Sequence, residues 1–218
     1  MHFEILVEGQ CENTALSILM PKIIGEYRQP HTWNIRPHRG IGKLPENPAA
    51  EPNKNDQTLL HNLPAKLKSY GIEQNPNLVV LVLVDLDDKA DCIAFKNQLL
   101  ALLDYCEIKP RTLFRIAVEE LEAWFLGDAA ALKSAYPDVR QDILDNYVQD
   151  SQIGTWELLA EAIHLGGIDA LLLKNKRSPL VLEEKRKWAK EISRHLNVDQ
   201  NQSPSFCCFR DGLRRMAI

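Results

Sequence analysis

The seven-residue run Leu78–Val84 constrains the fold more than any other segment, because every one of its residues is Leu or Val. A strand that is apolar on both faces belongs inside a parallel sheet with helices on each side. Phe3–Val7, His31–Pro37 and Leu113–Val118 are predicted to be further strands, since they are short apolar or alternating segments. The chain is therefore expected to contain a parallel sheet of at least four strands.

Segments with the apolar spacing of helices separate these strands. Cys11–Tyr27, Asp56–Tyr70 and Asp91–Tyr105 are predicted to be helical. Pro64 is expected to interrupt or kink the second helix, and Gly71 to end it. Alternating strands and helices require right-handed crossovers, so we expect an α/β fold: a Rossmann-like core with a mainly parallel sheet flanked by helices.

The strand pattern fades after Val118, and the rest of the chain has the pattern of helices. The expected helices are Leu121–Phe125, Asp128–Tyr136, Thr155–His164, Val181–Leu196 and Ser203–Met216. A Pro- and Asn-rich stretch, Pro45–Asn55, is expected to be a loop. We therefore divide the chain into an α/β core over residues 1–127 and a helical C-terminal extension over 128–218, packed on the core as one compact unit.

Composition restricts the expected cellular location of the protein. Of its 218 residues, 45% are hydrophobic, yet no apolar run approaches the roughly 20 residues of a membrane helix. The first residues begin a strand and lack the pattern of a signal peptide, so a cytoplasmic location is expected. The five cysteines are odd in number and form no CxxC pair, which argues against a zinc site or a disulfide framework.

Charge is distributed unevenly along the chain. The segment Lys174–Ile218 carries eleven Lys and Arg residues against five Asp and Glu residues, whereas the preceding residues carry fifteen against twenty-five. A basic segment beside an acidic one fits a protein that binds a polyanion. A solvated helix face explains the same pattern equally well.

Three acidic motifs follow three of the predicted strands. They are Glu8-Gly-Gln-Cys-Glu12, Asp85-Leu-Asp87-Asp88 and Glu119-Glu120-Leu-Glu122. The carboxyl ends of parallel strands share one edge of the sheet, where ligands bind in open α/β folds, so the acids should converge. Crowded carboxylates repel each other, and Mg²⁺, which prefers oxygen ligands, relieves that repulsion.

The motifs assign individual roles. Glu8 is a candidate metal ligand or general acid/base, and Glu12 a second catalytic residue beside it or behind it. The predicted metal ligands are Glu8, Asp85, Asp87, Glu119 and Glu122. Asp88 and Asp91 are expected to cap a turn or helix instead, and capping is the simplest explanation of any one motif taken alone.

Basic residues are candidates for contacts with a phosphate. Arg36, Arg39 and Lys43 surround Gly40 and Gly42, which permit close approach of the chain to a ligand; an ordinary loop is the alternative. The basic residues Lys174, Lys176 and Arg177 are candidates for contacts with a nucleic-acid backbone. Of the remaining residues, His31 and His38 are expected at the surface, and Trp124 is expected to pack a helix on the sheet.

The order of these motifs resembles that of a known fold family. A Glu within Glu-Gly-x-x-Glu after the first strand, followed by Asp-x-Asp after a hydrophobic strand, resembles the Toprim (topoisomerase–primase) domain, which the OLD-type nucleases share. The segments Ile5–Glu12, Val84–Asp88 and Ala117–Phe125 resemble more closely an uncharacterised bacterial family with a Toprim-like core. The C-terminal Ser203-Pro-Ser-Phe206 with Phe209 and Leu213 also fits the ending of that family.

The resemblance implies a cofactor and an activity. Mg²⁺ or Mn²⁺ would be bound through Glu8, Asp85 and Asp87, with Glu8 as general acid/base, and the reaction would be hydrolysis of DNA or RNA. Members of the resembled family are often encoded near ATPases in settings that suggest phage defence. The chain has no GxxxxGK[ST] motif, so an ATP-driven step would need a partner ATPase.

Three functional hypotheses follow. The first is a metal-dependent, nuclease-like phosphodiesterase that acts on nucleic acid, and the second is a non-catalytic Toprim-like subunit that docks to a partner ATPase. The third is a receiver-like pocket phosphorylated at Asp85, with which the Asp-x-Asp and Glu-x-x-x-Glu patterns agree poorly.

Overall fold

The computed structural model describes residues 1–87, 89, 91–151, 154–172 and 179–218. Within them, a single sheet of four parallel strands has the order β2-β1-β3-β4. The strands are β1 (His2–Val7), β2 (Thr32–Pro37), β3 (Leu78–Asp85) and β4 (Thr112–Ala117). The α/β architecture predicted from the sequence is confirmed.

Strand β3 lies inside the sheet, as its composition requires. It pairs with β1 on one side, where Phe3 is opposite Val79, and with β4 on the other, where Val84 is opposite Ile116. All eight of its residues are buried, so both faces of the strand are covered. The last of these residues, Asp85, brings a carboxyl group to the edge of the core.

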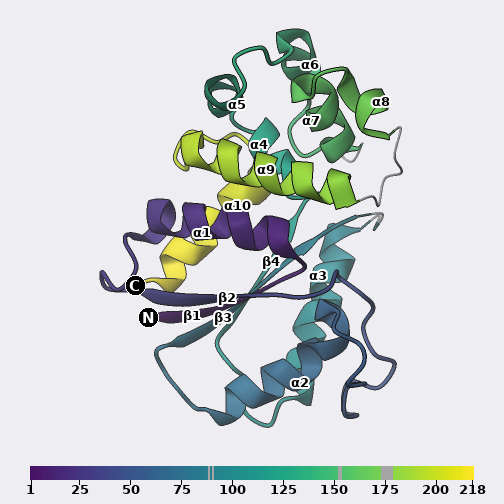
Figure 1. Cartoon of the computed structure of the whole chain (residues 1–218). Helices are drawn as coiled ribbons and strands as arrows, with labels where there is room; N and C mark the ends of the chain where they lie inside the picture. Colours follow the sequence, from purple (N-terminus) through teal and green to yellow (C-terminus); the bar gives the residue numbers. More distant parts are fainter. Residues whose placement is uncertain (88, 90, 152–153, 173–178) are drawn as a thin grey trace.

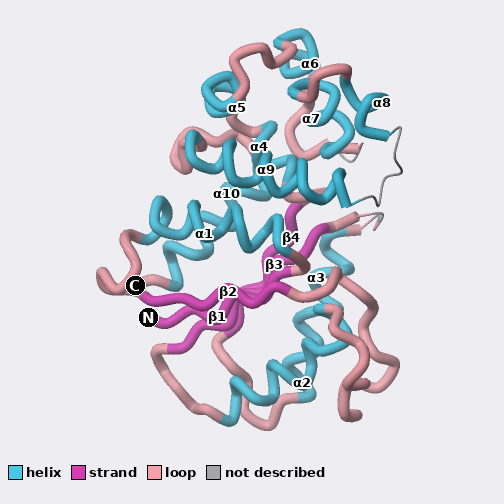
Figure 2. Tube along the Cα trace, viewed as in Figure 1, coloured by secondary structure: helices cyan, strands magenta, loops and turns pink. Residues whose placement is uncertain are grey.

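The helices form a layer on each face of the sheet (Figures 1 and 2). On one face lie α2 (Leu59–Ile72) and α3 (Cys92–Ala101), the latter continued by a 3₁₀ helix at Leu102–Tyr105. On the other lie α1 (Gln10–Ile24), α9 (Pro179–His195) and α10 (Pro204–Met216). The shorter helices beyond α9 are α4 (Glu122–Leu126), α5 (Ala129–Ala135), α6 (Gln141–Asn146), α7 (Thr155–Ile163) and α8 (Gly167–Leu172).

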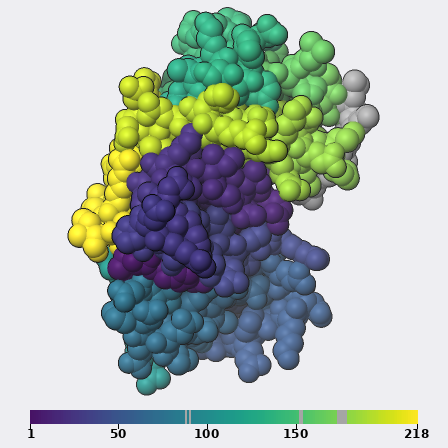
Figure 3. Space-filling view, turned by 60° about the vertical axis from the view of Figure 1, so that its left-hand side comes forward, coloured from purple at the N-terminus to yellow at the C-terminus, as the bar shows by residue number. Residues whose placement is uncertain are grey.

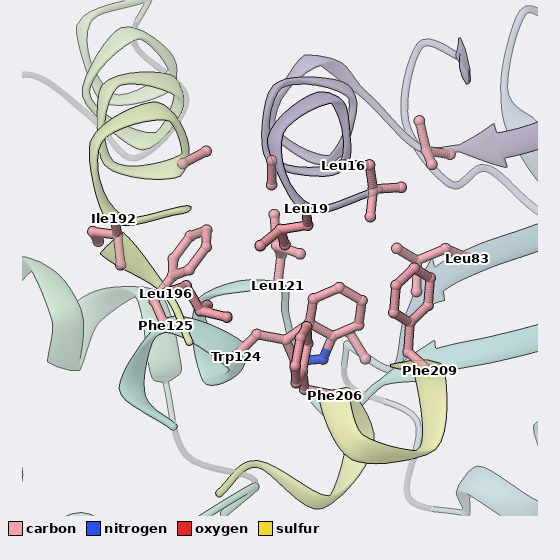
Figure 4. Close-up of a cluster of buried hydrophobic side chains, with 14 of the residues drawn as sticks. Leu16, Leu19, Leu83, Leu121, Trp124, Phe125, Ile192, Leu196, Phe206 and Phe209 are labelled. Carbon is pink, nitrogen blue, oxygen red and sulfur yellow. The ribbon is translucent and has the colours of Figure 1, made fainter. Parts of the chain in front are cut away.

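Aromatic side chains fasten the C-terminal helices to the sheet. The ring of Trp124 lies 5.3 Å from that of Phe206 and 4.8 Å from that of Phe209, between centroids. Its indole Nε1 donates a hydrogen bond of 3.0 Å to Ser205 Oγ, so its polar atom is satisfied within the core. Figure 4 shows these rings beside Leu16 and other side chains of α1. Trp124 is thus buried in the cluster between the sheet and the helices, where its direct ring contacts are with α10.

The hydrophobic core on this face is continuous between the two parts of the chain. One cluster of buried side chains joins the sheet and α1 to the helices of the extension. In Figure 3 the N-terminal residues, in purple, lie directly against the yellow-green C-terminal helices. A second cluster lies between the sheet and α2 and α3.

Several sequence predictions require correction. Helix α2 continues through Pro64 and Gly71 to Ile72, so Gly71 does not end it. His31 is buried, with its Nδ1 3.3 Å from the N-terminal amine, and His38 is half-buried, with Nδ1 2.9 Å from the Val7 carbonyl. Neither histidine is therefore a surface residue.

Two other predictions are confirmed. The segment Pro45–Asn55 contains no helix or strand. Asp91 caps α3 by accepting a hydrogen bond from Ala94 N.

Among the described residues, no helix has the length and apolar character needed to cross a membrane.

Candidate active site

A pocket of about 470 Å³ opens at the carboxyl ends of β1 and β3, and residues from the first turns of α9 also line it. We call it the acidic pocket. The charged side chains that line it are Glu8, Glu12, Asp85, Asp87, Glu120, Lys185 and Arg186. It therefore gathers acids from all three motifs, as the parallel strands predict, together with a lysine and an arginine from α9.

Glu8 joins the ends of two neighbouring strands. Its Oε1 accepts a hydrogen bond of 2.7 Å from the backbone N–H of Asp85, so the carboxyl group reaches from β1 to β3. Burial, together with the nearby carboxylates of Glu12 and Asp87, raises the pKa of Glu8 to about 8. The group therefore titrates near neutral pH, where a general acid or base works best.

Glu12 has a structural bond as well as a place in the pocket. Its Oε2 accepts a hydrogen bond of 2.8 Å from Gly9 N, which satisfies one backbone donor at the start of α1. The side chain is buried, and this burial, with the charge of Glu122, raises its pKa. Glu12 thus bonds the start of α1 and adds negative charge beside Glu8.

The two aspartates of the second motif lie in different environments. Asp85 is buried, and within the described residues its Oδ1 has no hydrogen-bond partner. Burial and the carboxylates of Glu8 and Glu12 raise its pKa well above the ordinary value. Asp87 has a positive φ of 47° and is more exposed, with its Oδ2 3.9 Å from Lys89 Nζ. Both aspartates still line the acidic pocket.

The third motif contributes residues other than those that we expected. Glu119 has a positive φ of 64°, and its Oε2 accepts a hydrogen bond of 3.0 Å from Thr155 N at the start of α7. Its side chain is therefore engaged with the helical extension and does not line the acidic pocket. Glu120 lines the pocket instead, and burial, followed by the charge of Glu122, raises its pKa to about 7.

Lys185, a residue of α9 that the sequence did not single out, balances part of this charge. Its Nζ lies 3.2 Å from an oxygen of Glu120 and 3.2 Å from an oxygen of Glu122, a nearly fully buried acid. Burial disfavours the ammonium form, but Glu122, Glu120 and Asp85 outweigh it and raise the pKa of Lys185. Glu122 thus serves as a partner of Lys185 behind the pocket.

The pocket offers oxygen donors for a hard cation. Among the described residues, no three Asp, Glu, His or Cys side chains are grouped closely enough to hold a metal ion. Two buried carboxylate oxygens at the pocket nevertheless have no described partner, Asp85 Oδ1 and Glu120 Oε2. Buried polar atoms are normally hydrogen-bonded, and carboxylates are the ligands that Mg²⁺ and Mn²⁺ prefer. Asp85 Oδ1 and Glu120 Oε2 are therefore candidate donors for such an ion, although the described side chains do not form a complete ligand set.

A family match covers this site. A model described as a domain of unknown function, DUF4276, matches residues 7–214. The chain belongs to the DUF4276 family. The matched region extends from the last residue of β1 into α10 and so includes every acid of the pocket and Lys185. No curated protein and no solved structure gives a significant match.

The predicted phosphate-binding residues are divided between different places. Arg36 and Arg39 line a second pocket, of about 630 Å³, next to the acidic one. Arg36 donates from Nε to Glu4 Oε2 at 2.9 Å, so its charge is already paired. Lys43 is exposed and lines neither of these two pockets. The basic residues Lys174, Lys176 and Arg177 lie outside the described residues.

Proposed function

We propose that this protein is a metal-dependent, nuclease-like phosphodiesterase that acts on nucleic acid in the cytoplasm. The observation that carries the proposal is the pair of unpartnered, buried carboxylate oxygens of Asp85 and Glu120 in a pocket that also holds Glu8. Such a cluster is satisfied by a divalent cation, and the resemblance to the Toprim fold supports the same chemistry.

The proposed ligands are Glu8, Asp85 and Asp87, with Glu120 beside them. When bound, Mg²⁺ or Mn²⁺ supplies an activated water and charge stabilisation for the phosphate. Glu8, which reaches from β1 to the end of β3, is also the proposed general acid/base at the reacting oxygen. Lys185 holds Glu120 in place through its 3.2 Å contact and opposes the rise in the pKa of that carboxyl that burial causes. Glu119 has no part in this site.

Cleavage assays test the proposal. Wild-type protein is incubated with plasmid, single-stranded DNA and RNA in Mg²⁺ or Mn²⁺, beside Asp85→Asn and Asp87→Asn. The matched control is Asp104→Asn, because Asp104 is an exposed acid whose only described ion pair joins it to Lys109 at the surface. Wild type and the control should cut, whereas the two pocket variants should lose at least about 100-fold in rate.

Metal binding gives a second measurement that does not depend on activity. Titration calorimetry with Mn²⁺ should show binding to wild type and to Asp104→Asn, and weaker binding to Asp85→Asn. Equal affinity in all three proteins, or cleavage that survives Asp85→Asn, contradicts the proposed site.

A second candidate is a non-catalytic Toprim-like subunit that docks to a partner ATPase. The contacts of Lys185 with Glu120 and Glu122 favour it, because they neutralise part of the acidic cluster without a metal ion. This candidate predicts no cleavage with any divalent metal, although the protein is folded, and a stable complex with an ATPase encoded beside it.

A further inference from the structure

The second pocket differs from the acidic one in charge, and we call it the basic pocket. It lies at the carboxyl end of β2, against α2 and the loop before it. One anionic side chain, Asp56, lines it, against four cationic ones: Arg36, Arg39, Lys54 and Lys66. An excess of positive charge in a hollow favours an anionic ligand.

The polar face of β2 creates this hollow. Asn34 and Arg36 alternate with Trp33 and Ile35, which pack against the core on the opposite face of the sheet. Arg36 and Asn34 both donate to the carboxylate of Glu4 on β1, at 2.9 and 2.7 Å. Arg36 is therefore neutralised by the protein itself and forms part of the wall.

Lys66 and Arg39 are not neutralised in this way. Within the described part of the chain, neither side chain has a carboxylate within ion-pair distance. Lys66 is half-buried on α2, and both its burial and the charge of Arg36 lower its pKa. The ammonium form of Lys66 is therefore stabilised when an anion enters the basic pocket.

The two pockets are neighbours on the same edge of the sheet. Gln10 lines both, and the consecutive residues Arg39 and Gly40 line one each. The backbone N–H of Gly40 donates to the carbonyl of Glu8 at 2.9 Å, which ties this loop to the acidic pocket. A ligand with regularly spaced anionic groups can therefore occupy both pockets at once.

We propose that the basic pocket binds a backbone phosphate of the nucleic acid, adjacent to the phosphate that the acidic pocket holds, through Lys66 and Arg39. This inference rests on the proposed function, because the acidic pocket supplies the other contact. Contacts of this kind position a strand without reading its sequence. Lys54, at the rim of the pocket, adds to the attraction.

Equilibrium binding tests the inference separately from cleavage. The probe is a fluorescently labelled oligonucleotide of mixed sequence, single-stranded or annealed to its complement, with the full-length protein in EDTA so that no metal reaction occurs. The variants are Lys66→Ala, Arg39→Ala, Lys66→Arg and Arg39→Lys. The matched control is Lys133→Ala, which removes one exposed lysine from α5.

Each alanine variant at the basic pocket should weaken binding about tenfold and reduce the slope of log affinity against log salt by about 0.7–0.9. The loss should be equal for different sequences, since a phosphate contact carries no base readout. Lys66→Arg and Arg39→Lys should keep most of the affinity, and Lys133→Ala all of it.

Other outcomes overturn the inference. They are an absence of wild-type binding, or losses in Lys66→Ala and Arg39→Ala no larger than that in Lys133→Ala. Direct binding of ATP or inorganic phosphate that depends on Lys66, in a protein that does not bind the oligonucleotide, assigns the pocket to a free phosphate and overturns the backbone assignment. Loss of cleavage in Asp85→Asn is judged separately, so a failed nuclease proposal and a failed basic pocket are distinguishable.

Discussion

At the scale of single residues, Glu8 links the chemistry of the acidic pocket to the stability of the protein. Its pKa is about 8 in the folded chain, against an ordinary value of 4.5. Between these pH values the folded protein holds a proton that the unfolded chain has lost. The free energy of unfolding therefore falls as pH rises through this window, by at most about 1.4 kcal/mol per pH unit for one proton.

Replacing Glu8 with Gln should remove this contribution. We expect Glu8→Gln to be more stable than wild type at pH 8 in the absence of divalent ions, and closer to it at pH 5. Urea unfolding between these pH values measures the difference, and Glu46→Gln, which changes an exposed acid, is the control. A wild-type stability that is flat or rises between pH 5 and 8, unchanged by Glu8→Gln, contradicts the raised pKa.

Lys185 is the second residue whose role can be tested through stability. In Lys185→Met, Glu120 and the buried Glu122 lose their cation, and an uncompensated buried charge is costly. We expect a loss of about 3 kcal/mol, at the low end of the usual range because Lys185 is partly exposed. Lys187→Met, which removes an exposed lysine from the same helix, should change stability by less than about 0.5 kcal/mol.

Neutralising Glu122, an ion-pair partner of Lys185, provides a control for the Lys185→Met variant. Adding Glu122→Gln to Lys185→Met should restore part of the lost stability, because it removes one of the two unpaired charges. Chemical denaturation of the three proteins at pH 7 measures this. A double variant that is as unstable as Lys185→Met would show that lost packing, not unpaired charge, is the cause.

At the scale of secondary-structure elements, patterns within one segment could be predicted from the sequence. All four strands lie within two residues of their predicted bounds, because their apolar runs are determined by burial in the sheet. The short helices α6 and α8 were not predicted, since α6 buries no residue and α8 buries only Leu171, so neither has a repeated apolar face in the sequence. Local sequence thus determines long, half-buried elements best.

Contacts between segments that are distant in the sequence could be predicted only in part from these patterns. The convergence of Glu8 and Asp85 follows from strand order, and was predicted. Glu120 lines the pocket in place of Glu119, and Glu119, directly after β4, has a positive φ. A motif of three glutamates contains no residue that would predict this backbone conformation. Lys185 comes to the pocket only because α9 packs on α1, a tertiary contact that its helical pattern does not specify.

Gly71 shows how packing between elements overrides helix propensity. Alanine normally stabilises a helix relative to glycine by about 1 kcal/mol. A Cβ at position 71, however, would clash with the carbonyl oxygen of Ile108. That oxygen is a backbone atom, so it cannot move aside as the end of a flexible side chain can. We expect Gly71→Ala to lower stability by about 2 kcal/mol through overpacking, as measured by thermal unfolding.

The matched variant is Ser69→Ala, an exposed position in the same helix, which should be neutral or slightly stabilising. Equal melting temperatures for the two variants would mean that the end of α2 can move away from the loop at Ile108.

At the scale of the whole molecule, the helical extension is part of both the core and the site. Its helix α10 packs against β4 on the face that α1 covers, whereas α9 packs on α1 and supplies Lys185 to the acidic pocket. The carboxyl edge of the sheet holds an acidic and a basic pocket side by side, which suits a ligand with phosphates in a row. Stability and the proposed function therefore depend on the same interface.

This shared core predicts that residues 1–127 do not fold alone. Without the extension, Leu16, Leu19 and the other apolar side chains on that face lose their cover from Trp188 and Phe209, and each large side chain returned to water costs about 1.5–3 kcal/mol. Several such losses exceed the 5–15 kcal/mol stability of a typical domain. Circular dichroism and calorimetry should show one cooperative transition for the full chain and none for the fragment 1–127. A fragment that melts cooperatively, or a full chain that unfolds in two separate steps, would show that the sheet and its helices form a domain without α9 and α10, and that the acidic pocket can form without Lys185.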